Sequence, residues 1–470
     1  MFHHNKAIIT TKPLNFNNKL TPEDLFEHFS AQPWAMWLDS CHSDHIDSRY
    51  DIIVWQPQIT LTTVGEETSI HYHDGNKTES TSDDPLLLLH KVKEKFYKNI
   101  EIEPNTLPFL TGALGYFAYD LGRRFERVPN EAIKDINIPD MAVGIYDQAI
   151  VFDNKSKQFS LITTDEKRAD VEQYILAMAD RTIEKIEDTF KLTGSWKANM
   201  SKVQYQEKFK KIQDYLHSGD CYQINLTQRF LSTYQGDEFQ AYTALRKANQ
   251  TPFSAFIRLD DCVILSISPE RFLQLSQGKV QSKPIKGTKP RSIDPIIDND
   301  NAAALKVSTK DQAENLMIVD LLRNDMSKVC IPGTVTVPKL FDLESFPAVH
   351  HLVSTVEGEL EETSNACDLF RAAFPGGSIT GAPKIRAMEI IDELEPQRRS
   401  LYCGSIGYIS ACGKMDTSIT IRTLICESTS PENKIYCWAG GGIVADSNVD
   451  DEYQESFDKV NKILPILANL

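Results

Sequence analysis

The chain of 470 residues is long enough to bury a large core, in one integrated domain or in two to three ordinary ones. Hydrophobic residues at 41% and charged residues at 25% are typical of globular proteins, and a net charge of −16 argues against binding to nucleic acid. No apolar run approaches membrane-spanning length, and the first residues lack the apolar core of a secretory signal. Nine cysteines without a C-x-x-C pair favour reduced thiols, so we expect a cytoplasmic enzyme or binding protein that contacts no membrane.

The first half of the chain is rich in predicted strands. Residues 51–54, 59–64 and 68–73 alternate in polarity or are β-branched, as expected of strands. Asp84 precedes a proline and predicts the start of a helix over 86–96, because its carboxylate can cap the first turn.

A second unit begins at Ser201, which forms a capping box with Gln204 ahead of an apolar helical stripe. Gly219 ends that predicted helix, and residues 222–227 alternate strictly, which predicts a half-buried strand. The fold class is therefore expected to be mixed α/β with substantial antiparallel sheet.

The charged stretch 165–191 has a helical period and suggests a boundary. We expect an N-terminal domain over 1–165, a connector over 166–200 and a second domain over 201–470.

The segment 284–288 places Lys286 in an apolar, glycine-flanked stretch that predicts a strand entering a turn. Desolvation lowers the pKa of a lysine, and a neutral amine is a nucleophile. Glu270 follows an apolar strand predicted over 263–267, and burial would raise its pKa toward that of a general acid. From these patterns alone, a snorkelling lysine and an exposed turn glutamate remain the better interpretation.

Two predicted helices each carry a pair of carboxylates three residues apart. Asp311 and Glu314 form one pair, and Glu452 and Glu455 form the other, with Lys459 one turn later. Converging carboxylates suit Mg²⁺, which binds protein oxygens together with water and substrate oxygens. Spacing alone favours two solvated helix faces.

Two glycine-rich segments, 375–384 and 439–447, predict turns whose exposed N–H groups can hold a carboxylate or phosphate. Arg422 lies in an alternating segment that predicts a strand, and its guanidinium suits a carboxylate. From the pattern alone, His351 and the segment 402–408 are better interpreted as packed core or strand-edge residues than as parts of a site.

Taken in order, these segments resemble the chorismate-utilising enzymes. The resemblance rests on 219–223, 268–272, 284–288, 313–315, 323–325, 375–384 and 440–447, and it covers roughly residues 200 to 465, with a similar N-terminal domain. It implies a two-lobed fold with large antiparallel sheets packed centrally and helices outside, and it makes 201–470 the chorismate-binding catalytic domain.

The resemblance also implies a role for each candidate residue. Glu314 and Glu455 would be the principal Mg²⁺ ligands, with Asp311 and Glu452 beside them. The carboxylates of chorismate would be held by Arg422, Tyr402 and the amides of Gly441 and Gly442, and the pocket would be completed by Ser378, Lys459 and His351, the last grouped with the catalytic residues.

Lys286 separates branches within the family, because anthranilate synthases usually carry alanine at the equivalent position. The lysine amine would attack the ortho ring carbon while Glu270 protonates the departing para hydroxyl. Ammonia would then attack the para carbon and displace the lysine, giving 4-amino-4-deoxychorismate for 4-aminobenzoate and folate synthesis. Because the sequence shows no glutaminase motif, we expect a separate glutamine amidotransferase subunit to supply the ammonia.

The N-terminal domain of the family carries a tryptophan pocket. The corresponding residues are Ser40, Asp47, Ser48, Arg49, Tyr50, Pro252, Phe253 and Ser254. Asp39 replaces the usual glutamate before Ser40, so a retained tryptophan and an empty pocket are both open.

Other functions remain open from the sequence. Anthranilate synthases share the fold, as do isochorismate and salicylate synthases, which use water in place of ammonia. A pyridoxal-phosphate enzyme with Lys286 as its Schiff-base lysine is a different class. The non-enzymatic alternative is an amino-acid-binding regulatory module.

Overall fold

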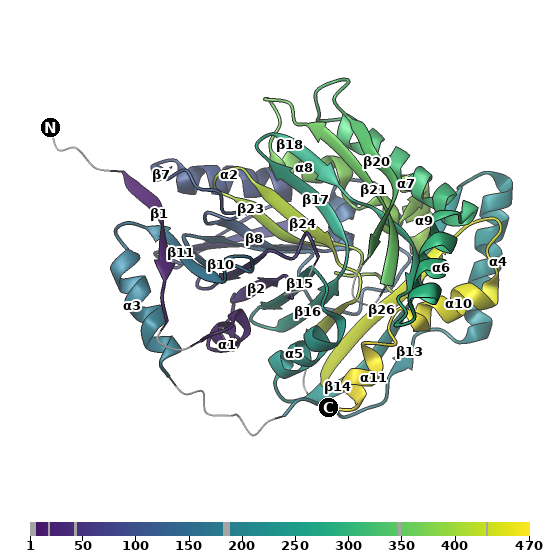
Figure 1. Cartoon of the computed structure of the whole chain (residues 1–470), viewed down its shortest axis with the longest axis horizontal. Helices are drawn as coiled ribbons and strands as arrows, with labels where there is room; N and C mark the ends of the chain where they lie inside the picture. The colour runs from purple at the N-terminus through teal and green to yellow at the C-terminus, as the bar shows by residue number, and fades with distance from the viewer. Residues whose placement is uncertain (1–5, 17–18, 42–44, 182–188, 346–348, 429–430) are drawn as a thin grey trace.

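The computed structural model describes residues 6–16, 19–41, 45–181, 189–345, 349–428 and 431–470. Two large, mostly antiparallel sheets form the centre of the molecule, and the helices lie outside them (Figure 1). This arrangement confirms the predicted fold class. Within the described ranges no helix combines the length and apolar character needed to cross a membrane.

The first sheet joins strands from both halves of the chain. In spatial order it contains β12 (Lys191–Leu192), β14 (Gln223–Gln235), β26 (Asn433–Ile443), β25 (Thr423–Glu427), β16 (Cys262–Ser268), β15 (Phe253–Arg258), β2 (Met36–Asp39), β3 (Tyr50–Val54), β10 (Gln148–Asp153), β11 (Gln158–Thr164), β1 (Ala7–Leu14) and β7 (Ile100–Ile102), with β13 (Lys197–Ala198) and β22 (Gly381–Ala382) also paired to β14. The pairing of β2 with β15 carries this sheet across the proposed connector.

The second sheet crosses the same boundary where β8 pairs with β23. Its order is β19 (Ile285–Pro290), β21 (Val349–Glu359), β18 (Lys279–Ser282), β17 (Arg271–Ser276), β24 (Met415–Ile419), β23 (Ser405–Ser410), β8 (Gly112–Phe117), β9 (Met141–Tyr146), β4 (Ile59–Val64), β5 (Glu67–Tyr72) and β6 (Lys77–Thr81), with β20 (Thr336–Ser345) on β21.

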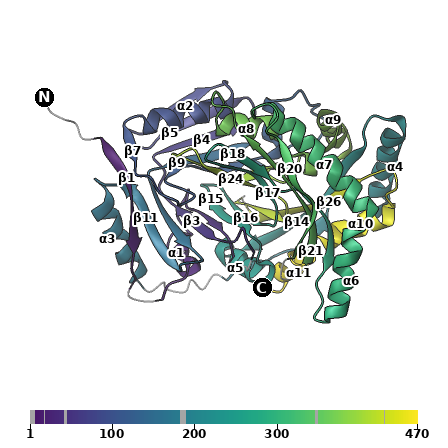
Figure 2. The ribbon, with the colours of Figure 1, turned by 45° about the horizontal axis from the view of Figure 1, so that its top comes forward.

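The helices cover the outer faces and ends of the sheets. They are α1 (Pro22–Glu27), α2 (Pro85–Tyr97), α3 (Arg168–Ala179), α4 (Lys202–Ser218), α5 (Glu238–Asn249), α6 (Pro295–Lys306), α7 (Thr309–Ser327), α8 (Ala366–Ala373), α9 (Lys384–Leu394), α10 (Val449–Asp458) and α11 (Leu464–Ala468), with the short 3₁₀ turns η1 (Tyr119–Arg124) and η2 (Gly377–Ile379). Helices α2 and α8 lie side by side along one edge, while β1 and α10 lie at opposite ends (Figure 2).

Most local predictions are confirmed. Asp84 caps α2 by accepting hydrogen bonds from the N–H groups of Leu86 and Leu87, and Ser201 forms the predicted capping box. Gly219 ends α4 with φ +82°, a left-handed conformation that glycine adopts without strain. In the stretch 165–191, residues 168–179 are helical and Lys191 begins a strand; residues 182–188 lie outside the described part.

Two strand predictions are wrong in part. Residues 222–227 were expected to be half-buried, but β14 is buried on both faces from Gln223 to Phe230. Its apolar face packs under α4 and α9, and on the other face Asn225 donates to the Ser378 carbonyl and the Thr227 N–H donates to Glu395. Arg422 lies between β24 and β25 with φ +52°, so the predicted strand is interrupted at this residue.

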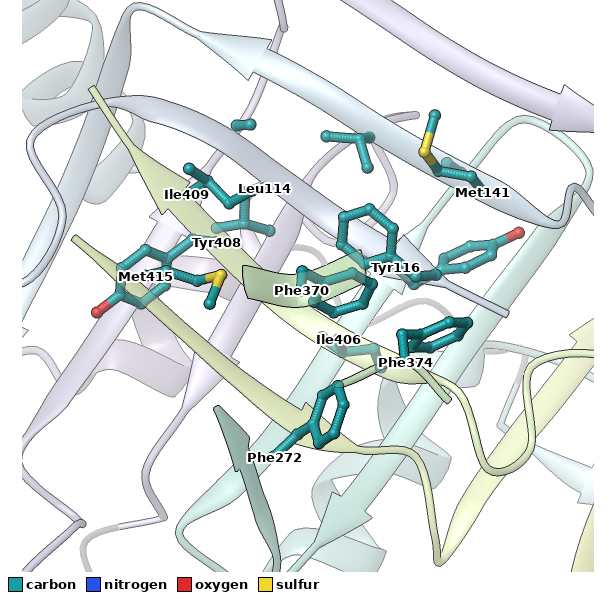
Figure 3. Close-up of a cluster of buried hydrophobic side chains, with 14 of the residues drawn as sticks. Leu114, Tyr116, Met141, Phe272, Phe370, Phe374, Ile406, Tyr408, Ile409 and Met415 are labelled. Carbon is teal, nitrogen blue, oxygen red and sulfur yellow. The ribbon is translucent and has the colours of Figure 1, made fainter. Parts of the chain in front are cut away.

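Aromatic side chains form part of a buried hydrophobic cluster close in sequence to Glu270 and Ser378 (Figure 3). Phe272 on β17 packs against Phe370 on α8 and against Phe374, with ring centroids 5.7 and 6.4 Å apart. Phe272 follows Glu270 by two residues, and Phe374 precedes Ser378 by four. Burial of these rings therefore helps to hold the two segments in place.

Candidate active site

Lys286 lies on β19, which pairs with β21 and does not turn away as predicted. The register shifts between Lys286 and Thr288, so Gly287 forms a bulge with φ +74°. A Cβ atom at Gly287 would lie 2.7 Å from Leu305 Cδ1 and 2.8 Å from Asp311 Cγ. Glycine is therefore required here, since α6 and α7 press directly against the bulge beside the lysine.

Glu270 and Lys286 both contact Ser378, which belongs to the short turn η2. The Ser378 hydroxyl donates to Glu270 Oε1 over 3.0 Å, and its carbonyl accepts a hydrogen bond from Lys286 Nζ over 3.3 Å. Glu270 is buried, whereas Lys286 is half-buried. The structure thus brings together three residues that lie far apart in the sequence.

Burial shifts both groups toward their neutral forms. It lowers the pKa of Lys286, although Glu314 and Glu270 oppose the shift. It raises the pKa of Glu270, against the effect of Lys286 and the hydrogen bond from Ser378. A neutral amine and a protonated carboxyl are the states that nucleophilic and general-acid catalysis require.

Arg422 supplies a positive charge near these groups. Burial lowers the pKa of its guanidinium, while the neighbouring Glu270 and Tyr402 raise it. None of the described residues hydrogen-bonds or ion-pairs with this guanidinium, so it is available to an anion. Tyr402 is buried, and its ring stacks on Trp438 with centroids 5.9 Å apart.

His351 lies on β21 opposite Thr288, whose hydroxyl is 2.9 Å from His351 Nδ1. Burial, together with Arg422, lowers the pKa of His351 to about 4. The imidazole is therefore neutral near pH 7 and can exchange hydrogen bonds without adding charge.

The glycines of β26 lie against the carboxylates of α10. A Cβ atom at Gly441 would lie 3.0 Å from Glu452 Oε2 and 3.1 Å from Glu455 Oε1. Lys459, at the end of α10, forms an ion pair with Glu455 over 2.6 Å and donates to the Gly440 carbonyl over 2.8 Å. The glycine segment and the acidic helix are therefore parts of the same site.

The pKa values of these two glutamates shift in opposite directions. Burial raises the pKa of Glu452, although Ser447 donates to its Oε1 over 2.7 Å. Burial acts in the same direction on Glu455, but Lys459 outweighs it and holds the pKa of Glu455 below its ordinary value.

The second acidic pair is at the start of α7, where the Ser308 hydroxyl accepts from the Asp311 N–H. Burial raises the pKa of Glu314, and the nearby Asp311 and Glu452 raise it further. The positive charges of Lys286 and Lys310 act in the opposite direction. Lys310, on α7, places its Nζ 3.6 Å from Glu452 Oε1 on α10, so this lysine forms an ion pair that joins the two acidic helices.

The acidic residues are suited to a hard divalent cation such as Mg²⁺. Carboxylates are its preferred protein ligands, and the buried Glu452 Oε2 has no hydrogen-bond partner in the described structure. Within the same residues, no three histidine, cysteine or acidic side chains converge as a complete metal cage. A cation at this site would therefore have at most two of the described side chains as ligands, and water or substrate would complete its coordination.

Three of the residues predicted to bind tryptophan contact either Cys41 or Arg271. Cys41, next to Ser40, donates to Ser254 Oγ over 3.2 Å, while Arg271 donates to Asp47 over 2.8 Å and lies 5.0 Å above the Phe253 ring.

The remaining members of the set have other contacts. Ser40 donates to Asp51 Oδ1 over 2.6 Å and accepts from Asn154, so its hydroxyl is fully engaged. Arg49 pairs with Asp153 and lies over the Tyr50 ring, while Ser48 and Pro252 are buried.

Sequence reasoning missed the polar residues that support the site. Asn225 donates to the Ser378 carbonyl over 3.1 Å, and Lys310 and Ser447 contact Glu452. Ser447 lies inside the glycine-rich segment and Lys310 directly precedes Asp311, so proximity to the motifs was the available signal. A separate cavity of about 620 Å³, near Trp34 and Asp260, is lined by none of the predicted site residues.

Comparisons with known proteins identify the family of the chain. The family model described as chorismate binding enzyme matches residues 35–465. Aminodeoxychorismate synthase component 1 of Klebsiella aerogenes is 56% identical over 94% of this chain and 95% of its own length, and that of Escherichia coli K12 is 55% identical with the same coverage. The crystal structure of anthranilate synthase component I from Streptococcus pneumoniae TIGR4 superposes with a TM-score of 0.78 at 30% identity, covering 90% of this chain and 93% of that one.

Proposed function

The chain belongs to the chorismate-binding enzyme family, and we propose that it aminates chorismate at the para position to give 4-amino-4-deoxychorismate. Three relatives that are 54–56% identical over almost the whole chain are named aminodeoxychorismate synthase component 1. The observation that carries the proposal is the contact of Ser378 with both Glu270 and Lys286, since this reaction needs an acid and an amine nucleophile together.

Two displacements account for the reaction. The neutral amine of Lys286 forms a bond to the ortho ring carbon, the two conjugated ring double bonds shift, and the para C–O bond breaks as Glu270 gives its proton to the leaving hydroxyl. The products of this step are water and a ring attached to the lysine. Ammonia then bonds to the para carbon, both double bonds shift back, and the C–N bond to Lys286 breaks. The attacking nitrogens release their extra protons, so Glu270 regains one and the lysine returns as an amine.

The regiochemistry follows from which carbon the enzyme itself occupies. With the ortho carbon bonded to Lys286, ammonia can complete an allylic displacement only at the para carbon. The shifts in the pKa of Lys286 and Glu270, both caused by burial, favour the protonation states that the first step uses.

Positive charge and backbone amides would hold the substrate on this acidic protein. We assign its carboxylates to Arg422, to Tyr402 and to the amides of Gly441 and Gly442, with Lys459 and His351 at the edge of the pocket. Glu314 and Glu455 would hold Mg²⁺, with Asp311 and Glu452 beside them. When bound, the cation would offset the negative charge of the ring carboxylate.

Ammonia would come from a glutamine amidotransferase partner. The relatives' designation as component 1 supports a second component. Eight of the nine cysteines are buried, and the exposed Cys412 lies in a turn with its sulfur 3.3 Å from Ser410 Oγ, which is a poor setting for a glutaminase nucleophile. The product would then feed 4-aminobenzoate synthesis after a lyase acts.

Tryptophan binding to the N-terminal residues is a separate proposal. The cluster around Arg271 and Phe253 supports an aromatic ligand, whereas the engaged hydroxyl of Ser40 weakens it. Equilibrium dialysis of the purified chain with tryptophan tests it, and an absence of saturable binding refutes it.

The main experiment uses the purified chain alone. It is incubated with chorismate, Mg²⁺ and ammonium at alkaline pH, the lyase is then added, and the aminobenzoate is identified. The para isomer supports the proposal. The ortho isomer would make the chain an anthranilate synthase, and no amination would indicate a water-using enzyme or a non-catalytic module.

A further inference from the structure

The carbonyl that contacts Lys286 has a second hydrogen-bond donor. Asn225, on β14, donates from Nδ2 to the Ser378 carbonyl over 3.1 Å, while Lys286 Nζ lies 3.3 Å from the same oxygen. A carbonyl oxygen has two lone pairs. Because one lone pair accepts the hydrogen bond from Asn225, only the other is open to the Lys286 amine, and the amine must approach from the side of that second lone pair.

Asn225 is itself held from several sides. Its N–H donates to the Thr380 carbonyl over 2.9 Å, and its own carbonyl accepts from Arg399 over 3.0 Å. Gln223, two residues earlier on the same face of β14, donates from Nε2 to Asn225 Oδ1 over 3.0 Å. The two amides form a relay that ends on the Ser378 carbonyl.

The direction of the relay leaves one acceptor unpaired. The Ser378 carbonyl can only accept, so Asn225 must present its amide nitrogen to it and its oxygen to Gln223. Gln223 must then present its nitrogen to Asn225, and Gln223 Oε1 has no hydrogen-bond partner among the described residues, although Gln223 is fully buried. A buried acceptor without a hydrogen bond lowers the free energy of unfolding, so we expect this arrangement of the two amides to reduce the stability of the protein.

The neighbouring backbone also leaves room for the relay. Gly442 lies opposite Asn225 on β26, and a Cβ atom there would lie 2.5 Å from Gln223 Nε2 and 3.0 Å from Asn225 Oδ1. A larger residue at this position would displace both amides.

We propose that Gln223 and Asn225 are positioning residues that fix the Ser378 carbonyl and, through it, the orientation of the Lys286 amine. They act through Ser378 and do not touch the reacting atoms. The inference rests on the proposed function, because an oriented lysine amine matters only if Lys286 is the nucleophile.

Two variants test the relay in the ammonia-dependent assay. Gln223→Met removes the donor to Asn225 together with the unpaired oxygen. We expect kcat to fall about 10-fold with the KM for chorismate within twofold of wild type, and a Tm equal to or above the wild-type value. Asn225→Asp replaces the donor facing Ser378 with an acceptor, and we expect a fall in kcat of about 100-fold with the same KM.

Asn199→Asp is the matched control, because Asn199 also donates a hydrogen bond from Nδ2, in its case to Gln397 Oε1 over 2.7 Å and away from the site. It should retain wild-type kcat and KM. Wild-type kcat in both relay variants, a loss of kcat accompanied by a lower Tm in Gln223→Met, or a raised KM with unchanged kcat would overturn the inference. If Gln223→Met does not fold, the claim that its unpaired oxygen destabilises the protein is refuted, and Asn225→Asp alone tests the positioning role. Failure of the wild-type chain to make an aminated product would instead refute the proposed function.

Discussion

The Ser378 hydroxyl donates to Glu270 Oε1 over 3.0 Å, and the carbonyl of the same serine lies 3.3 Å from Lys286 Nζ. One residue of a short turn therefore contacts both the proposed acid and the proposed nucleophile. Glu270 lies between β16 of the first sheet and β17 of the second, and Lys286 lies on β19 of the second sheet. The turn that carries Ser378 connects them.

Lys286→Ala should abolish the covalent route. We expect the rate of para-aminated product to fall at least about 100-fold with ammonium as the nitrogen source, because the ortho carbon is no longer occupied by the enzyme. Some ortho isomer should appear, which chromatography of the aminobenzoates after lyase treatment will detect. Lys289→Ala removes an exposed lysine from the same strand and should behave as wild type. Para product at the wild-type rate from Lys286→Ala would show that the lysine is not the nucleophile.

Glu270→Gln should separate activity from stability. Loss of the general acid should reduce kcat by about 100-fold or more. Burial raises the pKa of Glu270, so the folded protein retains a proton that the unfolded chain has lost. The wild type therefore loses stability as the pH rises from the ordinary glutamate value through this raised pKa, whereas the amide does not titrate.

Urea unfolding at pH 4.5 and pH 8 measures this difference. The free energy of unfolding of Glu270→Gln, relative to wild type, should be higher at pH 8 than at pH 4.5. The exposed Glu362→Gln should show no such change. A relative stability of Glu270→Gln that does not rise with pH would contradict the raised pKa of Glu270.

His351→Gln should alter stability on the acid side. The pKa of His351 falls from 6.5 in the unfolded chain to about 4 in the folded protein, so the unfolded chain binds more protons in this range. The wild type is then fully stabilised above pH 6.5 and loses up to about 3 kcal/mol as the pH falls through 4. The variant should lose less stability between pH 7 and pH 4, as measured by urea unfolding. The exposed His217→Gln is the control, and equal acid losses in His351→Gln and wild type would refute the prediction.

Glu314→Gln should weaken the activation by Mg²⁺. We expect the Mg²⁺ concentration for half-maximal activity to rise at least about 10-fold, because a carboxylate that favours a hard cation becomes a neutral amide. Asp320→Asn changes an exposed acid on the same helix and should leave the Mg²⁺ titration unchanged. Removal of divalent cations by a chelator should abolish wild-type activity, and full activity without them would exclude the proposed cation.

The sequence by itself determined the local elements and the chemical groups. Capping side chains at Asp84 and Ser201 and the left-handed Gly219 act within a few residues, so α2 and α4 were predictable from neighbouring positions. The three-residue spacing of the acidic pairs places each pair on one helical face whatever surrounds the helix.

Only the tertiary structure decided which of these groups meet. Glu270, Lys286 and Ser378 converge because β17, β19 and η2 are brought together by long-range strand pairing and by the Phe272 cluster, and no local pattern specifies those contacts. The burial of both faces of β14 was likewise decided by α4 and α9 on one side and by the Ser378 turn on the other. The pKa of Lys286 likewise depends on the burial of its own amine, since every neighbouring element contributes to desolvation, and not only the residues beside it in the chain.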